Sequence, residues 1–304
     1  MLKSFRGIYA ITCTPFNDDL SIDFASLRQC VDFIVASGAH GIVAPVNASE
    51  FYALDDQERV AVVETVAKQN AGRLPLIVGV SGIYKTVAQT FARHAKRCGA
   101  DGLIALPPYL IHATQKEIID YYRAISDAAE LPIFIQNCGG TQGTEMTASF
   151  MMEIVQQVPY ACYIKEETTF AGHVMTEILQ LGEKLPKGKF LGVMGGKAGR
   201  LMFDEFSRGC CGNMPACELC DVQARIWNFL DAGCTESALA IYEKIMPLLN
   251  MEMVYGGTIY KEILVRRGVI KSAANRELNR PKLDRYDYHE LDRLLGNVSK
   301  FFIL

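Results

Sequence analysis

Short apolar segments alternate with amphipathic segments through the first two thirds of the chain. Apolar runs of about four to eight residues are typical of strands buried in a parallel sheet. Between them, apolar positions recur with helical spacing, as at Leu27, Cys30, Val31, Ile34 and Val35. The pattern therefore predicts eight strands alternating with helices, with strands starting near residues 8, 42, 76, 103, 132, 161, 190 and 211.

Two polar pairs mark the starts of helices in this pattern. Asp55 and Thr114 are each followed three residues later by a glutamate, Glu58 and Glu117. This spacing predicts a capping box, in which the first side chain accepts from a backbone N–H and the glutamate reaches back.

The alternation defines a fold class. Strict β–α order predicts parallel strands joined by crossover helices, and eight units within roughly 220 residues fit a closed (β/α)8 TIM barrel better than an open sheet. From about residue 219 the pattern is helical throughout, with helices predicted at 222–232, 235–249, 254–267 and 288–302. We predict an α/β barrel over residues 1–218 and a C-terminal helical extension over residues 219–304.

Composition excludes several classes of partner. The 304 residues are 50% hydrophobic and 21% charged, with a net charge of −3, so neither nucleic acid nor a membrane is expected as a partner. No apolar run has membrane-spanning length, and the first residues lack the apolar core of a signal peptide. Half of the ten cysteines lie in apolar patterns, namely Cys13, Cys30, Cys98, Cys138 and Cys162. Cysteines of this kind favour a reduced, cytoplasmic protein.

The chain is organised around one lysine. Lys165 ends a short apolar strand and shares a strand face with Tyr163. Burial disfavours an ammonium ion, and a neutral amine can attack a ketone to form an iminium, which is an electron sink for bond cleavage. The alternative is a structural lysine paired with Glu166 or Glu167.

Residues at the strand ends suit a small substrate. In this fold the active site lies at the carboxyl ends of the strands. Small and amide side chains around one lysine fit a hydroxylated acid, and backbone N–H groups of the turn after the second strand can hold a carboxylate. The candidates at these ends are Asn47, Ala48, Ser49, Tyr109, Gln136, Gly195 and Met214.

Two of these motifs resemble a known family. Residues 46–50, Val-Asn-Ala-Ser-Glu, occupy the place of the Gly-Thr/Ser-Thr-Gly-Glu motif of the dihydrodipicolinate synthase / N-acetylneuraminate lyase family, and residues 163–168 match its Schiff-base lysine motif. The resemblance covers essentially the whole chain. It implies that Lys165 forms an imine with a 2-oxo acid, that Ala48 and its neighbours hold the carboxylate, and that the protein is a homotetramer.

The departures from the family pattern point to one branch. The fifth strand ends Gln136-Asn137 where most members have Tyr-Asn, and residues 138–143 contain no arginine for a second carboxylate. A second family tyrosine is replaced by Leu110, with Tyr109 just before it. The pattern Asn-x-Ser-Glu at residues 47–50, the fifth strand ending in Gln136, and Leu-Pro-Pro-Tyr at residues 106–109 instead resemble the 2-keto-3-deoxy-L-arabonate dehydratase branch, whose members eliminate water from a 2-oxo-3-deoxy sugar acid.

The predicted reaction is therefore a lysine-dependent dehydration. The Lys165 iminium acidifies C3, water leaves from C4, Ser49 moves the proton at the departing hydroxyl, and the Gln136 amide orients a hydroxyl or a water. Three alternatives remain open: retro-aldol cleavage of the same substrate class, condensation of pyruvate with aspartate semialdehyde, and a non-catalytic 2-oxo-acid-binding protein.

No cofactor is predicted. Cys217-x2-Cys220 has zinc-like spacing but lacks a partner pair at the usual spacing, so we predict no metal ligands. Gly195-Gly196-Lys197 lacks the spacing of a phosphate loop, and no dinucleotide glycine motif is present. Glu50 is predicted to be a buried structural carboxylate that accepts from loop N–H groups.

Overall fold

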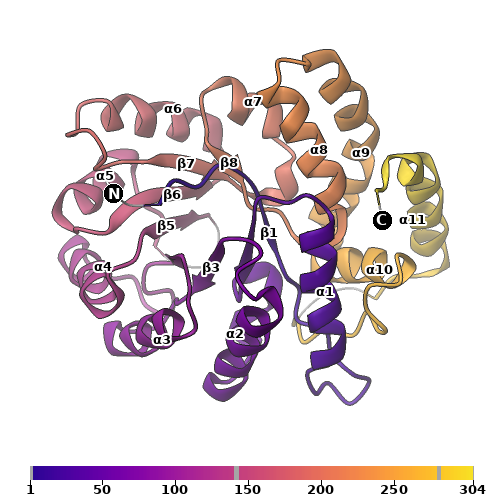
Figure 1. Ribbon diagram of the computed structural model, residues 1–304, viewed down its shortest axis with the longest axis horizontal. Helices are drawn as coiled ribbons and strands as arrows, with labels where there is room; N and C mark the ends of the chain where they lie inside the picture. Colours follow the sequence, from indigo (N-terminus) through magenta and orange to yellow (C-terminus); the bar gives the residue numbers. More distant parts are fainter. Residues whose placement is uncertain (1–2, 140–143, 279–281, 304) are drawn as a thin grey trace. The chain divides into compact units, whose positions relative to one another are not determined.

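Eight parallel strands close into a barrel in chain order (Figure 1). The structure is a computed structural model that describes residues 3–139, 144–278 and 282–303. Each strand begins within two residues of the predicted start, so the predicted TIM barrel is confirmed. The strands are β1 Gly7–Ile11, β2 Gly41–Ala44, β3 Leu76–Gly79, β4 Gly102–Ala105, β5 Ile133–Cys138, β6 Ala161–Glu167, β7 Gly192–Gly195 and β8 Gly212–Asn213.

The chain divides into two compact units, which are described separately. The first contains Pro75–Gly196, Leu201–Met214 and residues 3–6, and the second contains Gly7–Leu74, Lys197–Arg200 and Pro215–Leu304. The predicted boundary between a barrel at 1–218 and a helical region at 219–304 stays a prediction.

The first unit contains β3 to β8. Its core includes a stack of Phe134 on Tyr163, with ring centroids 4.4 Å apart, and Phe5 packs against both rings. The capping box predicted at Thr114 and Glu117 is present. The helices of this unit are α3 Lys85–Arg97, α4 Gln115–Ala129, α5 Ala148–Gln157, α6 Ala171–Gly182 and α7 Met202–Ser207.

The second unit contains β1 and β2, which pair in parallel, and the C-terminal helices. The capping box at Asp55 and Glu58 is also present. The helices are α1 Phe24–Ala36, α2 Asp56–Asn70, α8 Cys220–Asp231, α9 Thr235–Tyr255, α10 Gly257–Arg266 and α11 Arg285–Val298, with short 3₁₀ helices η1 Asn47–Ser49, η2 Phe51–Ala53, η3 Lys197–Gly199, η4 Cys217–Leu219 and η5 Ser299–Phe301.

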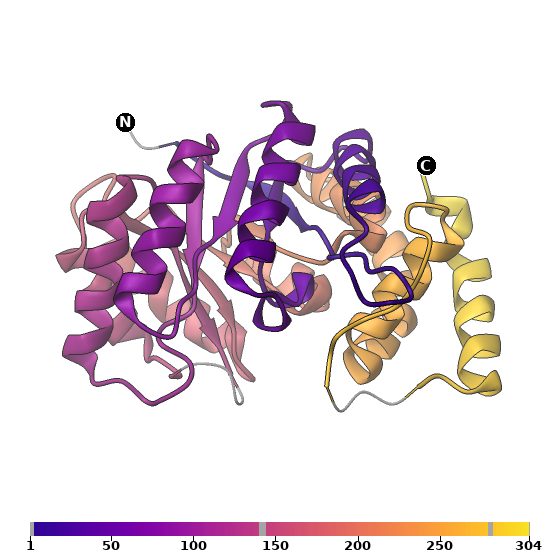
Figure 2. The same ribbon diagram turned by 90° about the horizontal axis from the view of Figure 1, so that it is seen from below.

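The ninth helix differs from its prediction. It does not stop at residue 249 but runs through Pro247 to Tyr255, and Gly256 ends it at a φ of 56°. Leu248, Leu249 and Met251 remain buried beyond the proline, so apolar packing outweighs the lost N–H donor. Figures 1 and 2 show α9, α10 and α11 side by side. Among the described residues, no helix is long and apolar enough to cross a membrane.

Candidate active site

Lys165 lies in β6 and is 2% exposed. Its Nζ atom is 3.1 Å from Oε1 of Glu167, which is also buried. Side chains alternate along a strand, so residues 165 and 167 share a face while Glu166 points to the other. Of the two carboxylates that the sequence offered as partners for Lys165, the structure selects Glu167.

An amide holds this carboxylate in place. Gln136 Nε2 donates to Glu167 Oε1 over 2.6 Å, and Gln136 pairs with Lys165 in the register of β5 and β6. We call Lys165, Glu167 and Gln136 the Lys165 cluster. It joins an amine, a titratable carboxylate and an amide in a site nearly closed to solvent, where electrostatic interactions are stronger than in water.

Two glycines make room for this arrangement. A Cβ atom at Gly196 would collide with Glu167 Oε2 and lie 3.0 Å from Lys165 Cε. A Cβ atom at Gly195 would collide with the carboxylate of Glu205. A side chain at either position would displace one of the two acids, which explains the paired glycines at the end of β7.

Glu205 is a second buried acid next to the cluster. Asn213 Nδ2 donates to its Oε2 atom over 2.7 Å, and the side chain is 2% exposed. Burial raises the pKa of Glu205 to about 8, and the nearby negative charge of Glu167 adds to this effect. A carboxyl group that is mostly protonated at neutral pH adds no second anion beside Lys165 and Glu167.

The opposite face of β6 has a structural role. Asn137 Nδ2 donates to Glu166 Oε2 over 2.7 Å, and Asn137 Oδ1 accepts from the backbone N–H of Met146. The backbone N–H of Thr168 donates to Glu166 Oε1. Burial raises the pKa of Glu166. This acid therefore ties β5, β6 and the segment before α5 together and points away from the Lys165 cluster.

The residues predicted to hold the substrate carboxylate lie in the second unit. Ser49 is fully buried, and its Oγ atom donates to the carbonyl of Thr12 over 2.5 Å. Thr14 Oγ1 donates to the carbonyl of Ser49 over 2.6 Å, and Tyr260 donates its hydroxyl to the carbonyl of Ala48 over 3.0 Å. Hydrogen bonds thus fix the backbone of the turn that begins at Asn47.

Glu50 completes this turn and is structural, as predicted. It adopts the left-handed conformation with a φ of 54°. Its carboxylate is ion-paired with Lys261 and accepts from the backbone N–H of Arg276 over 2.6 Å. Both Glu50 and Lys261 are fully buried, and Lys261 also donates to the carbonyl of Ala274.

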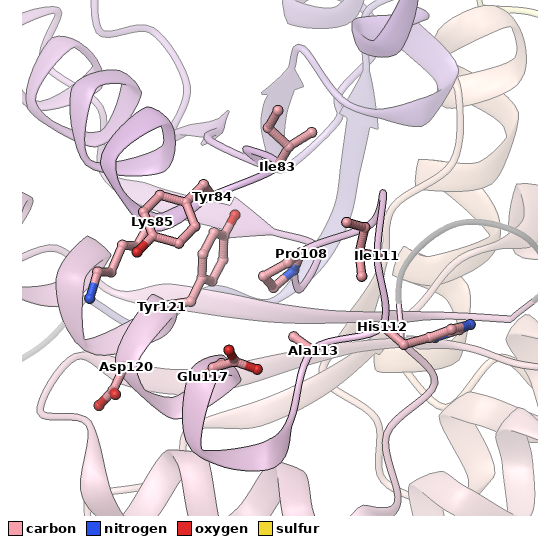
Figure 3. A pocket seen from close by; sticks show the side chains of 10 residues that line it. All are labelled: Ile83, Tyr84, Lys85, Pro108, Ile111, His112, Ala113, Glu117, Asp120 and Tyr121. Carbon is pink, nitrogen blue, oxygen red and sulfur yellow. The ribbon is translucent and has the colours of Figure 1, made fainter.

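A pocket of about 290 Å³ lies elsewhere in the first unit, between the start of α3 and the β4–α4 loop. Figure 3 shows Tyr84, Pro108 and Tyr121 around it, and no member of the Lys165 cluster lines it. Tyr109 follows Pro108 but is not among the lining residues. The pocket therefore gives no support to a substrate contact by Tyr109.

The other predicted substrate contacts stay predictions. Met214 is buried, and its backbone N–H donates to the carbonyl of Gly195 over 3.0 Å. The part of the loop after β5 that contains Thr141 and Gln142 lies outside the described residues. The structure brings Lys165 and Gln136 together in the first unit and places Asn47, Ala48 and Ser49 together in the second.

Sequence reasoning missed two acids. Glu167 entered it only as a structural partner of the lysine, although its two-residue spacing from Lys165 on a strand signals a shared face. Glu205 lies on α7 beside exposed residues, and no local pattern marks it as a neighbour of β6 and β7.

In the barrel, β6 carries a buried lysine with a carboxylate and an amide against the amine. Members of the family whose sequence model this chain matches are class I lyases, so the protein is a class I lyase. The chain belongs to the dihydrodipicolinate synthetase family, whose sequence model matches residues 4–289.

The similar proteins are named for different activities. The chain is 29% identical over 266 residues to L-2-keto-3-deoxyarabonate dehydratase of Azospirillum brasilense, covering 86% of this chain and 84% of that protein. It is 29% identical over 246 residues to a 4-hydroxy-tetrahydrodipicolinate synthase of a Jannaschia species, covering 81% and 82%. The crystal structure of dihydrodipicolinate synthase from Rhodopseudomonas palustris matches with a TM-score of 0.87 and 26% identity, covering 98% of this chain and 100% of the other.

Proposed function

We propose that this enzyme dehydrates a 2-keto-3-deoxy sugar acid through an imine on Lys165. One observation carries the proposal: Glu167 lies 3.1 Å from Lys165 Nζ. It accepts a hydrogen bond from Gln136, the residue that stands where most of the family is expected to have a tyrosine. The similarity to an L-2-keto-3-deoxyarabonate dehydratase supports the same substrate class.

The reaction needs one amine and one proton-transfer group. The substrate ketone condenses with Lys165 and releases water. The resulting iminium at C2 withdraws electrons and makes the protons on C3 acidic. A base then removes a proton from C3, the electron pair forms the C3–C4 double bond, and hydroxide leaves C4 with a proton. Hydrolysis of the imine regenerates Lys165, so the net change is loss of one water.

Glu167 is the group that we assign to the proton transfer. Its carboxylate lies within hydrogen-bond distance of the amine that bears the substrate, so it is placed to take the C3 proton and return it to the departing hydroxide. Gln136 cannot titrate, but its N–H keeps one carboxylate oxygen fixed. Ser49 is a weaker candidate than the sequence indicated, because its hydroxyl donates to Thr12.

The remaining assignments follow the sequence prediction. We propose that Asn47, Ala48 and Ser49 provide the carboxylate site and that the enzyme assembles as a homotetramer. The synthase alternative requires a site for a second carboxylate and a group to protonate the aldehyde oxygen. Retro-aldol cleavage uses the same imine, so its test is the product: an aldehyde and pyruvate instead of a dehydrated acid.

The experiment is a side-by-side assay of the purified protein on 2-keto-3-deoxy pentonates and hexonates and on pyruvate with aspartate semialdehyde. We expect turnover of a sugar acid without release of pyruvate. Borohydride reduction in the presence of pyruvate should place one adduct on Lys165 by peptide mass. Turnover of pyruvate with the semialdehyde, and of no sugar acid, would contradict the dehydratase.

Lys165→Arg is the matched variant for the imine. It keeps a positive charge opposite Glu167 but cannot form the adduct, so both trapping and turnover should disappear. Lys197→Arg is the control, because Lys197 directly follows Gly196 at the end of β7 and the proposal does not use it. An adduct on Lys197 in the native enzyme would overturn the mechanism.

A further inference from the structure

Three cysteines from distant parts of the chain converge in the second unit. Cys13 follows β1, Cys30 lies on α1 and Cys217 begins η4, and their Sγ atoms all lie within 4.8 Å of one another. The Sγ atoms of Cys13 and Cys30 are 3.8 Å apart. Each residue is at most 1% exposed. We call these residues the trithiol cluster.

The members of the cluster are not the two cysteines of the Cys217-x2-Cys220 motif. Cys220, three residues further on, does not join it and instead donates its Sγ–H to Ser37 Oγ over 3.2 Å. The partners of Cys217 are Cys13 and Cys30, roughly two hundred residues away. Local spacing therefore singled out one member of the cluster, and the other two meet it only in the folded chain.

The surroundings hold the thiols in position. Cys13 lies between Thr12 and Thr14, and both neighbours form hydrogen bonds with Ser49. Cys30 lies within a helix whose start is capped by Asp23. A site whose ligands are fixed before binding loses little conformational freedom when it takes an ion.

We infer that the trithiol cluster is a binding site for a soft, thiophilic metal ion in three-coordinate sulfur geometry, of which Cu(I) is the representative. Soft thiolates select soft ions, whereas structural zinc sites and cysteine-bound iron–sulfur centres use four protein ligands. Among the described residues, the group contains three ligands and no fourth histidine, cysteine or carboxylate.

The spacing fits this geometry. Trigonal-planar coordination of one ion by three sulfur atoms, with metal–sulfur bonds of about 2.3 Å, places the sulfur atoms about 4.0 Å apart. This value lies between the 3.8 Å of Cys13 and Cys30 and the 4.8 Å limit of the group. Binding replaces thiol protons, which pass to water, and it changes no oxidation state, so no oxidant or reductant takes part.

The test is anaerobic titration of the reduced protein with Cu(I) against a competing Cu(I) chelator. We expect one ion retained per chain, with X-ray absorption showing three sulfur neighbours. Cys13→Ala, Cys30→Ala and Cys217→Ala should each lose this retention, while the controls Cys220→Ala and Cys234→Ala keep it. Serine variants at the same three positions serve where an alanine variant does not fold.

Three results would overturn the site. The first is retention of the ion by the Cys30 variants when circular dichroism shows them folded. The second is tighter binding of Zn(II) than of Cu(I), which would mean a fourth ligand. The third is recovery of two fewer thiols after the ion is removed, because the cluster would then have formed a disulfide instead of a metal site.

Discussion

The Lys165 cluster and the turn at residues 47–50 are built by different means. In the cluster, Gln136, Lys165 and Glu167 come from two neighbouring strands, and strand alternation with register suffices to place them. In the turn, Ala48 and Glu50 receive hydrogen bonds from residues more than 200 positions away. Chemistry at the lysine thus follows from secondary structure, whereas the shape of the turn depends on the C-terminal helices.

The two regions also use a buried lysine–glutamate pair in opposite ways. Lys261 is saturated: it contacts Glu50, donates to Ala274 and lies 4.4 Å from the ring centroid of Phe16. Lys165 has one acceptor, Glu167, among the residues that the structure describes. A lysine with all its donors used stabilises the fold, while one with capacity left is available for a substrate.

Removing the saturated lysine should have the largest effect on stability. Lys261→Met leaves Glu50 buried without its cation, and we expect the free energy of unfolding to fall by about 3–5 kcal/mol. Urea denaturation measures this loss. Lys116→Met is the control, because Lys116 forms an exposed pair with Asp120 and should change stability by at most about 1 kcal/mol. Equal effects of the two variants would refute the contrast between the regions.

The next test separates the two faces of β6. Glu167→Gln keeps the size and polarity of the side chain but removes the proton-transfer group, so kcat should fall by about 10²- to 10³-fold. Imine trapping with pyruvate should remain detectable. Glu166→Gln changes the opposite face, and we expect a loss of stability with kcat within about tenfold of the native value. Comparable kcat losses in both variants would mean that Glu167 acts only by packing.

Ser49→Ala tests whether the turn takes part in proton transfer. The sequence prediction, a relay at the departing hydroxyl, implies a loss in kcat of roughly one to three powers of ten. The hydrogen bond from Ser49 to Thr12 favours a positioning role, so we expect at most about tenfold, with an unchanged pH profile of kcat. A larger loss together with a shifted pH profile would restore the relay.

The effect expected at Glu205 is on stability and depends on pH. Burial raises its pKa from 4.5 to about 8, so the folded protein keeps a proton that the unfolded chain loses. The resulting stability is fully present below about pH 4.5 and is lost as pH rises to 8. Glu205→Gln removes this dependence. The difference in free energy of unfolding between the variant and the native protein should therefore shift in favour of the variant, by on the order of 1–3 kcal/mol, from pH 5 to pH 8.

Thermal unfolding of both proteins at the two pH values measures this difference. The exposed variant Glu153→Gln is the control and should show the same gap to the native protein at pH 5 and pH 8. The same gap for Glu205→Gln at both values would show that Glu205 ionises freely in the fold.

The sequence by itself determined the barrel and its lysine. Apolar runs and helical spacing report local periodicity, which is why the eight strand starts and both capping boxes followed from it. Alternation predicted that Tyr163 and Lys165 share a face, while Glu166 and Glu167 stayed equal candidates as partners of the amine. The end of α9 was misjudged because packing beyond Pro247 is not visible in a propensity pattern.

Only the tertiary structure decided the contacts between distant residues. Nothing in the local sequence links Glu50 to Lys261, Glu205 to Asn213 or Cys13 to Cys217, because each pair meets only when separate elements pack. The environment in the fold then gives these groups their properties. Burial raises the pKa of Glu205, the Ser49 hydroxyl donates to the carbonyl of Thr12, and the three thiols of the cluster are shielded from water. A sequence pattern shows which groups are present, but desolvation and neighbouring charge, which fix how they behave, exist only in the folded chain.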